Sequence, residues 1–226
     1  MQETSSLPKQ VDEINFNRFS AWFDMLIKDH GFLRLCYNNY HKVNENIYRS
    51  NMPTPSRIRN YSEIGIKTII NLRGVRKDGG WLLENEACKK YNIKLIDFRA
   101  RSRAAPEKEM ILSAEKLFNN IEYPALIHCK SGADRAGIMC ALYMLIYEKK
   151  NAEIANKQLS WKYLHIKWAK PGVLDSFVKE YGVEYKKSKL KFMDWVKKKY
   201  DPITLEKNFR SVWWINRLVD DILKRE

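Results

Sequence analysis

The chain has 226 residues, of which 45% are hydrophobic and 30% charged, so it is long and apolar enough for a globular domain with a sizeable core. Its formal net charge of +14 indicates an acidic or phosphorylated partner, or else a lysine-rich solubilising surface. The four cysteines form no Cys-x-x-Cys pair and have no histidine at metal-ligand spacing, which disfavours a disulfide framework and a metal site. We expect a cytoplasmic protein, because neither a signal peptide nor a membrane span is evident.

The first third of the chain reads as helix, strand, helix and strand. Apolar residues at helical spacing predict a helical segment over about 12–40, with a break at Gly31. A strand and a proline-containing turn follow, and then a short helix capped by Thr54 or Ser56. The β-branched run at 66–72 is typical of a buried strand.

The middle of the chain continues this alternation. It predicts helices and strands in turn, over residues 81–91, 93–98, 107–120, 125–128 and 135–147. Such alternation indicates an α/β fold with a central, mostly parallel sheet flanked by helices on both faces. Beyond residue 151 the chain looks helical and no linker precedes it. We therefore expect one domain over 1–226, with its core at about 43–181 and a helical extension at 182–226.

The stretch "ALIHCKSGADRAGIMCALYMLIYE" places Cys129 six positions before Arg135, between a buried strand and a helix. Backbone amides at a helix start bind phosphate, and the same field favours a cysteine thiolate. An arginine offers a planar fork that matches two phosphate oxygens. Gly132 permits the dihedrals of a tight loop, and Gly137 lets the helix start close to the sheet. The alternative is a buried, inert cysteine beside an arginine that merely opens a helix, and core packing is the expected role of Cys140.

The segment "HCKSGADRAG" resembles the signature loop of the cysteine-dependent protein tyrosine and dual-specificity phosphatases. The stretch "NIYRSNMPTPSRIRNYSEIGIKTIINLRG" is similar to the small bacterial members of the dual-specificity branch. The resemblance implies a phosphomonoester hydrolase that needs no metal or cofactor and forms a phosphocysteine on Cys129. It also implies that Arg135 binds the phosphate and that His128 tunes the thiolate. The loop residues that would supply phosphate-binding groups are Lys130, Ser131, Gly132, Ala133, Asp134 and Arg135.

The sequence departs from the family pattern at two places. Ala136 stands where the family usually has a serine or threonine that assists the leaving thiolate, and Ser131 is a candidate substitute. The loop after the strand at 93–98 also lacks the usual aspartic acid that protonates the leaving group. Three candidates remain for this acid, in the order Asp134, Asp97 and Glu107.

Two basic regions have both a functional and a structural interpretation. Arg99, Arg101 and Arg103 would stand at the mouth of the pocket and bind a second phosphate, or they form a solvated loop. The segment 186–200 interleaves lysines with apolar residues, which indicates either peripheral contact with an anionic membrane or, as we favour, packing on the core. Trp213 and Trp214 near the C-terminus pose the same choice.

The expected substrate is phosphotyrosine or another phosphorylated protein residue. A phosphoinositide or other phosphorylated lipid headgroup is the second hypothesis, and a weakly catalytic phosphate-binding module is the third. Nucleic-acid binding is not expected, because no recognition motif is present. The sequence gives no indication of the oligomeric state.

Overall fold

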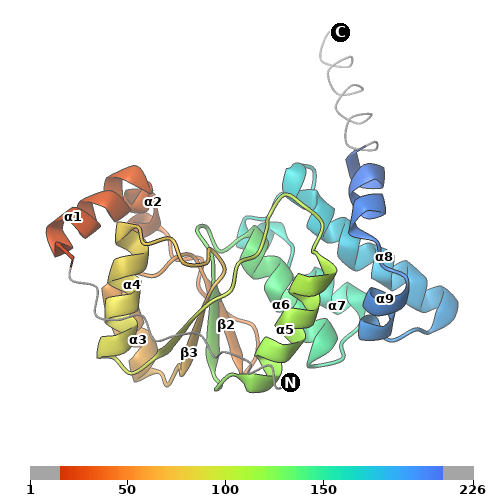
Figure 1. Ribbon diagram of the computed structural model, residues 1–226, viewed down its shortest axis with the longest axis horizontal. Helices are drawn as coiled ribbons and strands as arrows, with labels where there is room; N and C mark the ends of the chain where they lie inside the picture. The colour runs from red at the N-terminus through yellow and green to blue at the C-terminus, as the bar shows by residue number, and fades with distance from the viewer. Residues whose placement is uncertain (1–15, 211–226) are drawn as a thin grey trace, which may run out of the picture.

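The computed structural model describes residues 16–210, and a five-stranded sheet lies at its centre (Figure 1). The strand order is β1-β2-β5-β3-β4, and only the β1–β2 pair is antiparallel. The strands are β1 (His41–Lys42), β2 (Ile47–Ser50), β3 (Thr68–Asn71), β4 (Lys94–Asp97) and β5 (Ala125–His128). The predicted α/β fold with a mostly parallel sheet is confirmed. The sequence did not predict β1, whose two residues are too few to show a strand pattern.

Helices cover both faces of the sheet, which explains why every residue of its central strands β3 and β5 is buried. Side chains alternate along a strand, so Ile69 and Leu126 pack against α3 (Pro55–Glu63) and α4 (Gly79–Lys90). Ile70 and Ile127 face the other way, into the larger core cluster. The helices α5 (Lys108–Asn120) and α6 (Asp134–Ile146) contribute to that cluster on the opposite side (Figure 1). The loops at the carboxyl ends of the strands thus meet at one edge of the sheet.

The helices beyond residue 151 extend the same core. The elements in this part are α7 (Ala152–Asn156), the short η2 (Trp161–Tyr163) and η3 (Lys170–Gly172), α8 (Val173–Ser188), α9 (Phe192–Lys198) and a last helix over 202–210. Phe192 and Trp195 pack edge to face or tilted against Phe177 within the core cluster. The predicted packing of segment 186–200 on the core is therefore confirmed. None of the helices within 16–210 is long and apolar enough to cross a membrane, and Trp213 and Trp214 lie outside the described residues.

The N-terminal helices pack beside α4 and carry one side chain into the site described below. They are α1 (Arg18–Phe23), the π-helical η1 (Asp24–Lys28) and α2 (Gly31–Cys36). Met25 and Leu83 of α4 form the small core that joins them. The predicted break lies at His30, which has a φ of 53°, immediately before Gly31. This break leaves Asp29 at the end of η1 directed toward the loop edge of the sheet.

Candidate active site

The loop that begins at Cys129 joins the end of β5 to the start of α6. Because β5 lies between β2 and β3, the loop stands at the middle of the edge formed by the carboxyl ends of the strands. Cys129 is buried, with 2% of its surface exposed, so only a small group such as a phosphate reaches its sulfur. The structure therefore places the cysteine at the carboxyl end of β5, at the start of the loop that leads to the N-terminus of α6 and to Arg135.

Four consecutive backbone carbonyls of this loop accept hydrogen bonds from residues outside the loop. The Lys130 carbonyl accepts from the Met52 amide at 3.3 Å, and the Ser131 carbonyl accepts from Asn39 Nδ2 at 2.9 Å. The Gly132 and Ala133 carbonyls accept from one arginine, as described next. Across a trans peptide the N–H points opposite to the C=O. Carbonyls that face outward therefore turn the amides of residues 131–134 inward, where they form an anion-binding cradle.

Arg49, on β2, is the side chain that holds two of these carbonyls. Its Nη2 donates to the Gly132 carbonyl at 2.7 Å and to the Ala133 carbonyl at 3.0 Å. Its Nη1 donates to the Gln158 carbonyl and side chain, at 2.8 and 3.0 Å, and the guanidinium stacks 3.9 Å from the ring centroid of Tyr163. Burial lowers the pKa of Arg49, but a guanidinium still stays charged. Sequence reasoning missed this residue, although an arginine within a predicted strand of a buried sheet is a usable signal.

Two glycines permit the tight path of the loop. Gly132 has a φ of +77°, and a Cβ there would lie 2.7 Å from the backbone of Ser50 and Asn51, so both conformation and space require glycine. A Cβ on Gly137 would lie 2.9 Å from the Gln158 carbonyl. The closest approach at Gly137 is thus to the segment after α7, whereas the sequence predicted an approach to the sheet.

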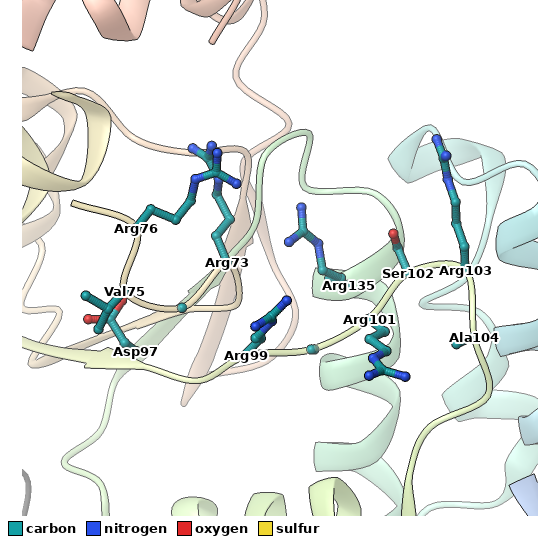
Figure 2. A pocket seen from close by; sticks show the side chains of 12 residues that line it. Arg73, Val75, Arg76, Asp97, Arg99, Arg101, Ser102, Arg103, Ala104 and Arg135 are labelled. Carbon is teal, nitrogen blue, oxygen red and sulfur yellow. The ribbon is translucent and has the colours of Figure 1, made fainter. Parts of the chain in front are cut away.

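Arg135 opens into a cavity of about 720 Å³ (Figure 2). The guanidinium makes one long contact, from Nη1 to the Leu72 carbonyl at 3.5 Å, and is otherwise available to a ligand. Residues from three segments of the chain line the cavity: Arg73, Gly74, Val75, Arg76, Asp97, Arg99, Ala100, Arg101, Ser102, Arg103, Ala104 and Arg135. The three arginines predicted at the mouth of the pocket do lie there, and two further arginines join them.

The cavity arginines differ in how their charge is compensated. Arg73 pairs with Asp29, Arg76 Nε with Asp78 at 2.5 Å, and Arg101 with Glu107 at 2.9 Å. Arg99 and Arg103 have no hydrogen-bond or ion-pair partner within residues 16–210. These two side chains therefore bring uncompensated positive charge to the cavity.

Asp29 ties the N-terminal helices to the site, a link that the sequence did not predict. Its oxygens accept from both Nη atoms of Arg73, at 3.0 and 2.9 Å, and from Arg34 Nη2 at 2.8 Å. Lys130 Nζ, from the phosphate loop, lies 3.2 Å from Asp29 Oδ1. Burial alone would raise the pKa of Asp29, but the charges of Arg73 and Arg34 and the bond from Lys130 outweigh it, so the pKa is lowered. Asp29 therefore stays ionised and is unsuited to donate a proton.

The candidate acids lie in three different environments. Asp97, at the end of β4, lines the cavity and accepts from Asn71 Nδ2 at 2.8 Å and Trp81 Nε1 at 3.0 Å. Burial raises its pKa, and these hydrogen bonds only partly offset the effect. The Asp134 carboxylate is bonded to the His165 ring at 2.7 Å and is not among the residues that line the cavity. Glu107 is half exposed and paired with Arg101.

Three other predicted residues have clear surroundings. His128 is buried, and its Nε2 lies 2.6 Å from Glu84 Oε1 of α4, so a buried carboxyl group lies beside the residue that precedes the cysteine. Ser131 Oγ accepts from the Ala133 amide at a long 3.4 Å. Cys140 is fully buried in the core, where burial raises its pKa to about 11, in agreement with the predicted packing role.

The fold and this loop define the class of cysteine-dependent phosphatases of the protein-tyrosine and dual-specificity type. Residues 38–171, more than half of the chain, match the family described as PTP-SAK, the Swiss Army Knife protein DSP-PTPase phosphatase domain. The chain therefore belongs to the dual-specificity phosphatase superfamily and is a phosphatase of this type. Its membership of the bacterial branch stays a prediction.

Individual relatives are distant. The chain is 24% identical over 182 residues to the inositol diphosphatase DSP3 of Arabidopsis thaliana. The alignment covers 78% of this chain and 77% of the relative. Among solved structures, P. aeruginosa TpbA in complex with pTyr has a TM-score of 0.52 at 15% identity, covering 62% of this chain and 83% of that one. Tk-PTP in the active form has a TM-score of 0.50 at 14% identity, covering 63% and 97%. These structures support the fold.

Proposed function

We propose that the chain hydrolyses a phosphomonoester through a phosphocysteine. The Cys129 thiolate attacks phosphorus, the P–O bond to the leaving alcohol breaks, and water later releases phosphate from the sulfur. The inward amides of the loop and the Arg135 fork bind the equatorial phosphate oxygens and stabilise their charge in the transition state. The observation that supports these roles is the outward anchoring of four carbonyls beside an arginine that is free for a ligand.

Asp97 is the proposed proton donor to the leaving oxygen. This places it before Asp134, which the sequence had ranked first. It is the one candidate of the three that lines the cavity with Arg135, and burial favours its protonated form. Asp134 and Glu107 are already engaged by His165 and Arg101.

The proposed substrate is a small molecule or headgroup that carries several phosphates, such as an inositol polyphosphate or a phosphoinositide. A cavity of about 720 Å³ is wide for a single aryl phosphate, and six arginines line it. Arg99 and Arg103, which have no ion-pair partner in the described part of the chain, suit a second phosphate beside the one held by Arg135. The name of the plant relative, an inositol diphosphatase, agrees with this substrate class. Phosphotyrosine, the first hypothesis from the sequence, is the competing outcome.

The test compares kcat/KM for a soluble inositol polyphosphate, a short-chain phosphoinositide and a phosphotyrosine peptide. The double variant Arg99→Ala/Arg103→Ala should lose about 10-fold or more on the multiply phosphorylated substrates and less than about 3-fold on the peptide. The difference should shrink with added salt, because salt screens exposed charges. The matched control is Lys116→Ala/Lys179→Ala, which removes the same charge from exposed helix positions away from the cavity. Equal losses on all three substrates, or a wild-type preference for the peptide, would return the assignment to phosphoproteins.

A further inference from the structure

A histidine lies buried between two carboxylates directly behind the phosphate loop. His165 Nδ1 is 2.7 Å from Asp134 Oδ1, and His165 Nε2 is 2.5 Å from Asp175 Oδ2. His165 is 1% exposed and Asp175 is 3% exposed. A neutral imidazole has only one N–H, so it would direct a lone pair at one of these carboxylates. The geometry therefore favours the imidazolium, which donates to both.

The three residues come from separate parts of the chain. Asp134 is the first residue of α6, His165 lies between η2 and η3, and Asp175 is in the first turn of α8. Among the other charged groups nearby, Lys167 Nζ lies 3.9 Å from Asp175 Oδ1, and Arg49 of β2 feels the charge of Asp134. Burial alone would lower the pKa of His165, but the hydrogen bonds and charges of the two aspartates outweigh it and raise the pKa to about 9.

The charge of the Asp134 carboxylate affects how the phosphate loop binds an anion. The Asp134 amide belongs to the cradle and the next residue is Arg135, so the Asp134 carboxylate belongs to the same turn as the groups that bind phosphate, although it is directed toward His165. An uncompensated carboxylate there would repel a phosphate dianion. With the imidazolium in place, this charge is neutralised, and the start of α6 is fastened to α8.

We propose that His165, held as an imidazolium by Asp134 and Asp175, is a positioning residue that neutralises Asp134 and so allows the phosphate loop to bind a dianion. His165 does not touch the substrate and acts through Asp134. The proposal concerns the phosphate loop itself and is independent of which phosphorylated substrate the cavity selects.

The test measures binding of tungstate, a phosphate analogue that stays a dianion in alkaline solution, by calorimetry. The Cys129→Ser protein is used throughout, because it removes the titration of the cysteine. The dissociation constant should rise about 10-fold or more from about pH 7.5 to about pH 10, as His165 loses its proton. In Cys129→Ser/His165→Gln, binding should be weak at the lower pH already and should lack this transition.

Asp175→Asn in the same background supplies a second readout that a purely structural role would not move. With one carboxylate partner lost, the midpoint of the affinity change should fall to a lower pH. The Asp175→Asn variant also keeps the proposal testable if circular dichroism shows that the His165 variant does not fold. Affinity that is independent of pH in the Cys129→Ser protein overturns the proposal. So does an unchanged midpoint in Asp175→Asn, or an absence of tungstate binding at every pH.

Discussion

The phosphate loop, residues 129–135, and the arginine loop, residues 99–106, contribute to the same cavity but are held in opposite ways. Each carbonyl from Lys130 to Ala133 accepts a hydrogen bond from another element. The arginine loop is fastened near its ends, where the Ala100 amide donates to the Leu72 carbonyl and the Ala105 amide to Glu206. Between these points the described residues provide one exposed ion pair, Arg101 with Glu107.

This difference suits two tasks. Stabilising a transition state requires donors that are already in place, because reorganising them during the reaction would cost free energy. Selecting a substrate with several phosphates instead requires long cationic side chains that adjust to where each phosphate lies. We therefore expect substitutions in or under the phosphate loop to act on every substrate, and substitutions in the arginine loop to act on particular ones.

The largest expected effect among the arginines is that of Arg135→Lys. An ammonium cannot reproduce the two parallel hydrogen bonds of the guanidinium fork, so kcat/KM should fall about 100-fold or more on every phosphomonoester. Steady-state kinetics on an aryl phosphate and an inositol polyphosphate measure it. A rate near that of the wild type would mean that Arg135 only opens α6.

The variants Arg49→Met and Arg99→Met compare a buried arginine with an arginine on an exposed loop. Arg99→Met is the matched control. Arg49 donates to four buried oxygens, of which the Ala133 carbonyl also accepts from the Gly137 amide. Removing the guanidinium therefore leaves the other three without this donor, so the free energy of unfolding should fall by about 3 kcal/mol, and kcat should fall with it. Arg99→Met should leave stability unchanged, because Arg99 has no hydrogen-bond or ion-pair partner among the residues that the structure describes. Urea denaturation gives both values, and equal stabilities would contradict the anchoring role of Arg49.

Asp97→Asn separates the proposed acid from Asp134. An amide cannot donate a proton in place of the carboxylic acid, so substrates with poor leaving groups should slow about 100-fold, while activated aryl phosphates should change little. Asp134→Asn should slow both kinds of substrate to the same degree, since Asp134 acts through the loop. The reverse pattern would make Asp134 the acid, as the sequence first suggested.

The smallest effect is expected for Glu107→Gln, which frees Arg101 from an exposed ion pair. Exposed pairs contribute little to stability, so the melting temperature should stay the same. The affinity for a multiply phosphorylated substrate should rise by no more than about 3-fold at low salt, because one more cation becomes available. A marked loss of activity would contradict this and make Glu107 a participant in the reaction.

The sequence predicted what depends on local pattern. The run from Ala125 to His128, the Cys129 to Arg135 spacing and the strand–helix alternation all lie in short stretches, and the strand, loop and α6 follow from them with bounds shifted by about one residue. The burial of the apolar side chains Phe192, Trp195 and Val196 within segment 186–200 also followed from their helical spacing.

What it missed depends on contacts between distant segments. Arg49 meets the phosphate loop 83 residues later, and Asp29 reaches Arg73 across 44 residues. His165 meets Asp134 across 31 residues, and this contact is one reason why we propose Asp97 ahead of Asp134 as the acid. Nothing local marks such partners, because hydrogen bonds between side chains and remote elements leave no periodic pattern in the sequence.

The central claim is that Cys129 becomes phosphorylated on a loop built to hold phosphate, and rapid-quench kinetics with an aryl phosphate tests it most directly. Because Ala136 provides no hydroxyl to assist the leaving thiolate, the intermediate should accumulate. We predict a burst of about one phenol per active site, with a chelator present, and a phosphoryl group on the peptide that contains Cys129. Cys129→Ser should abolish burst and turnover. Steady turnover in that variant, or turnover of the wild type with Cys129 never modified, would contradict the account.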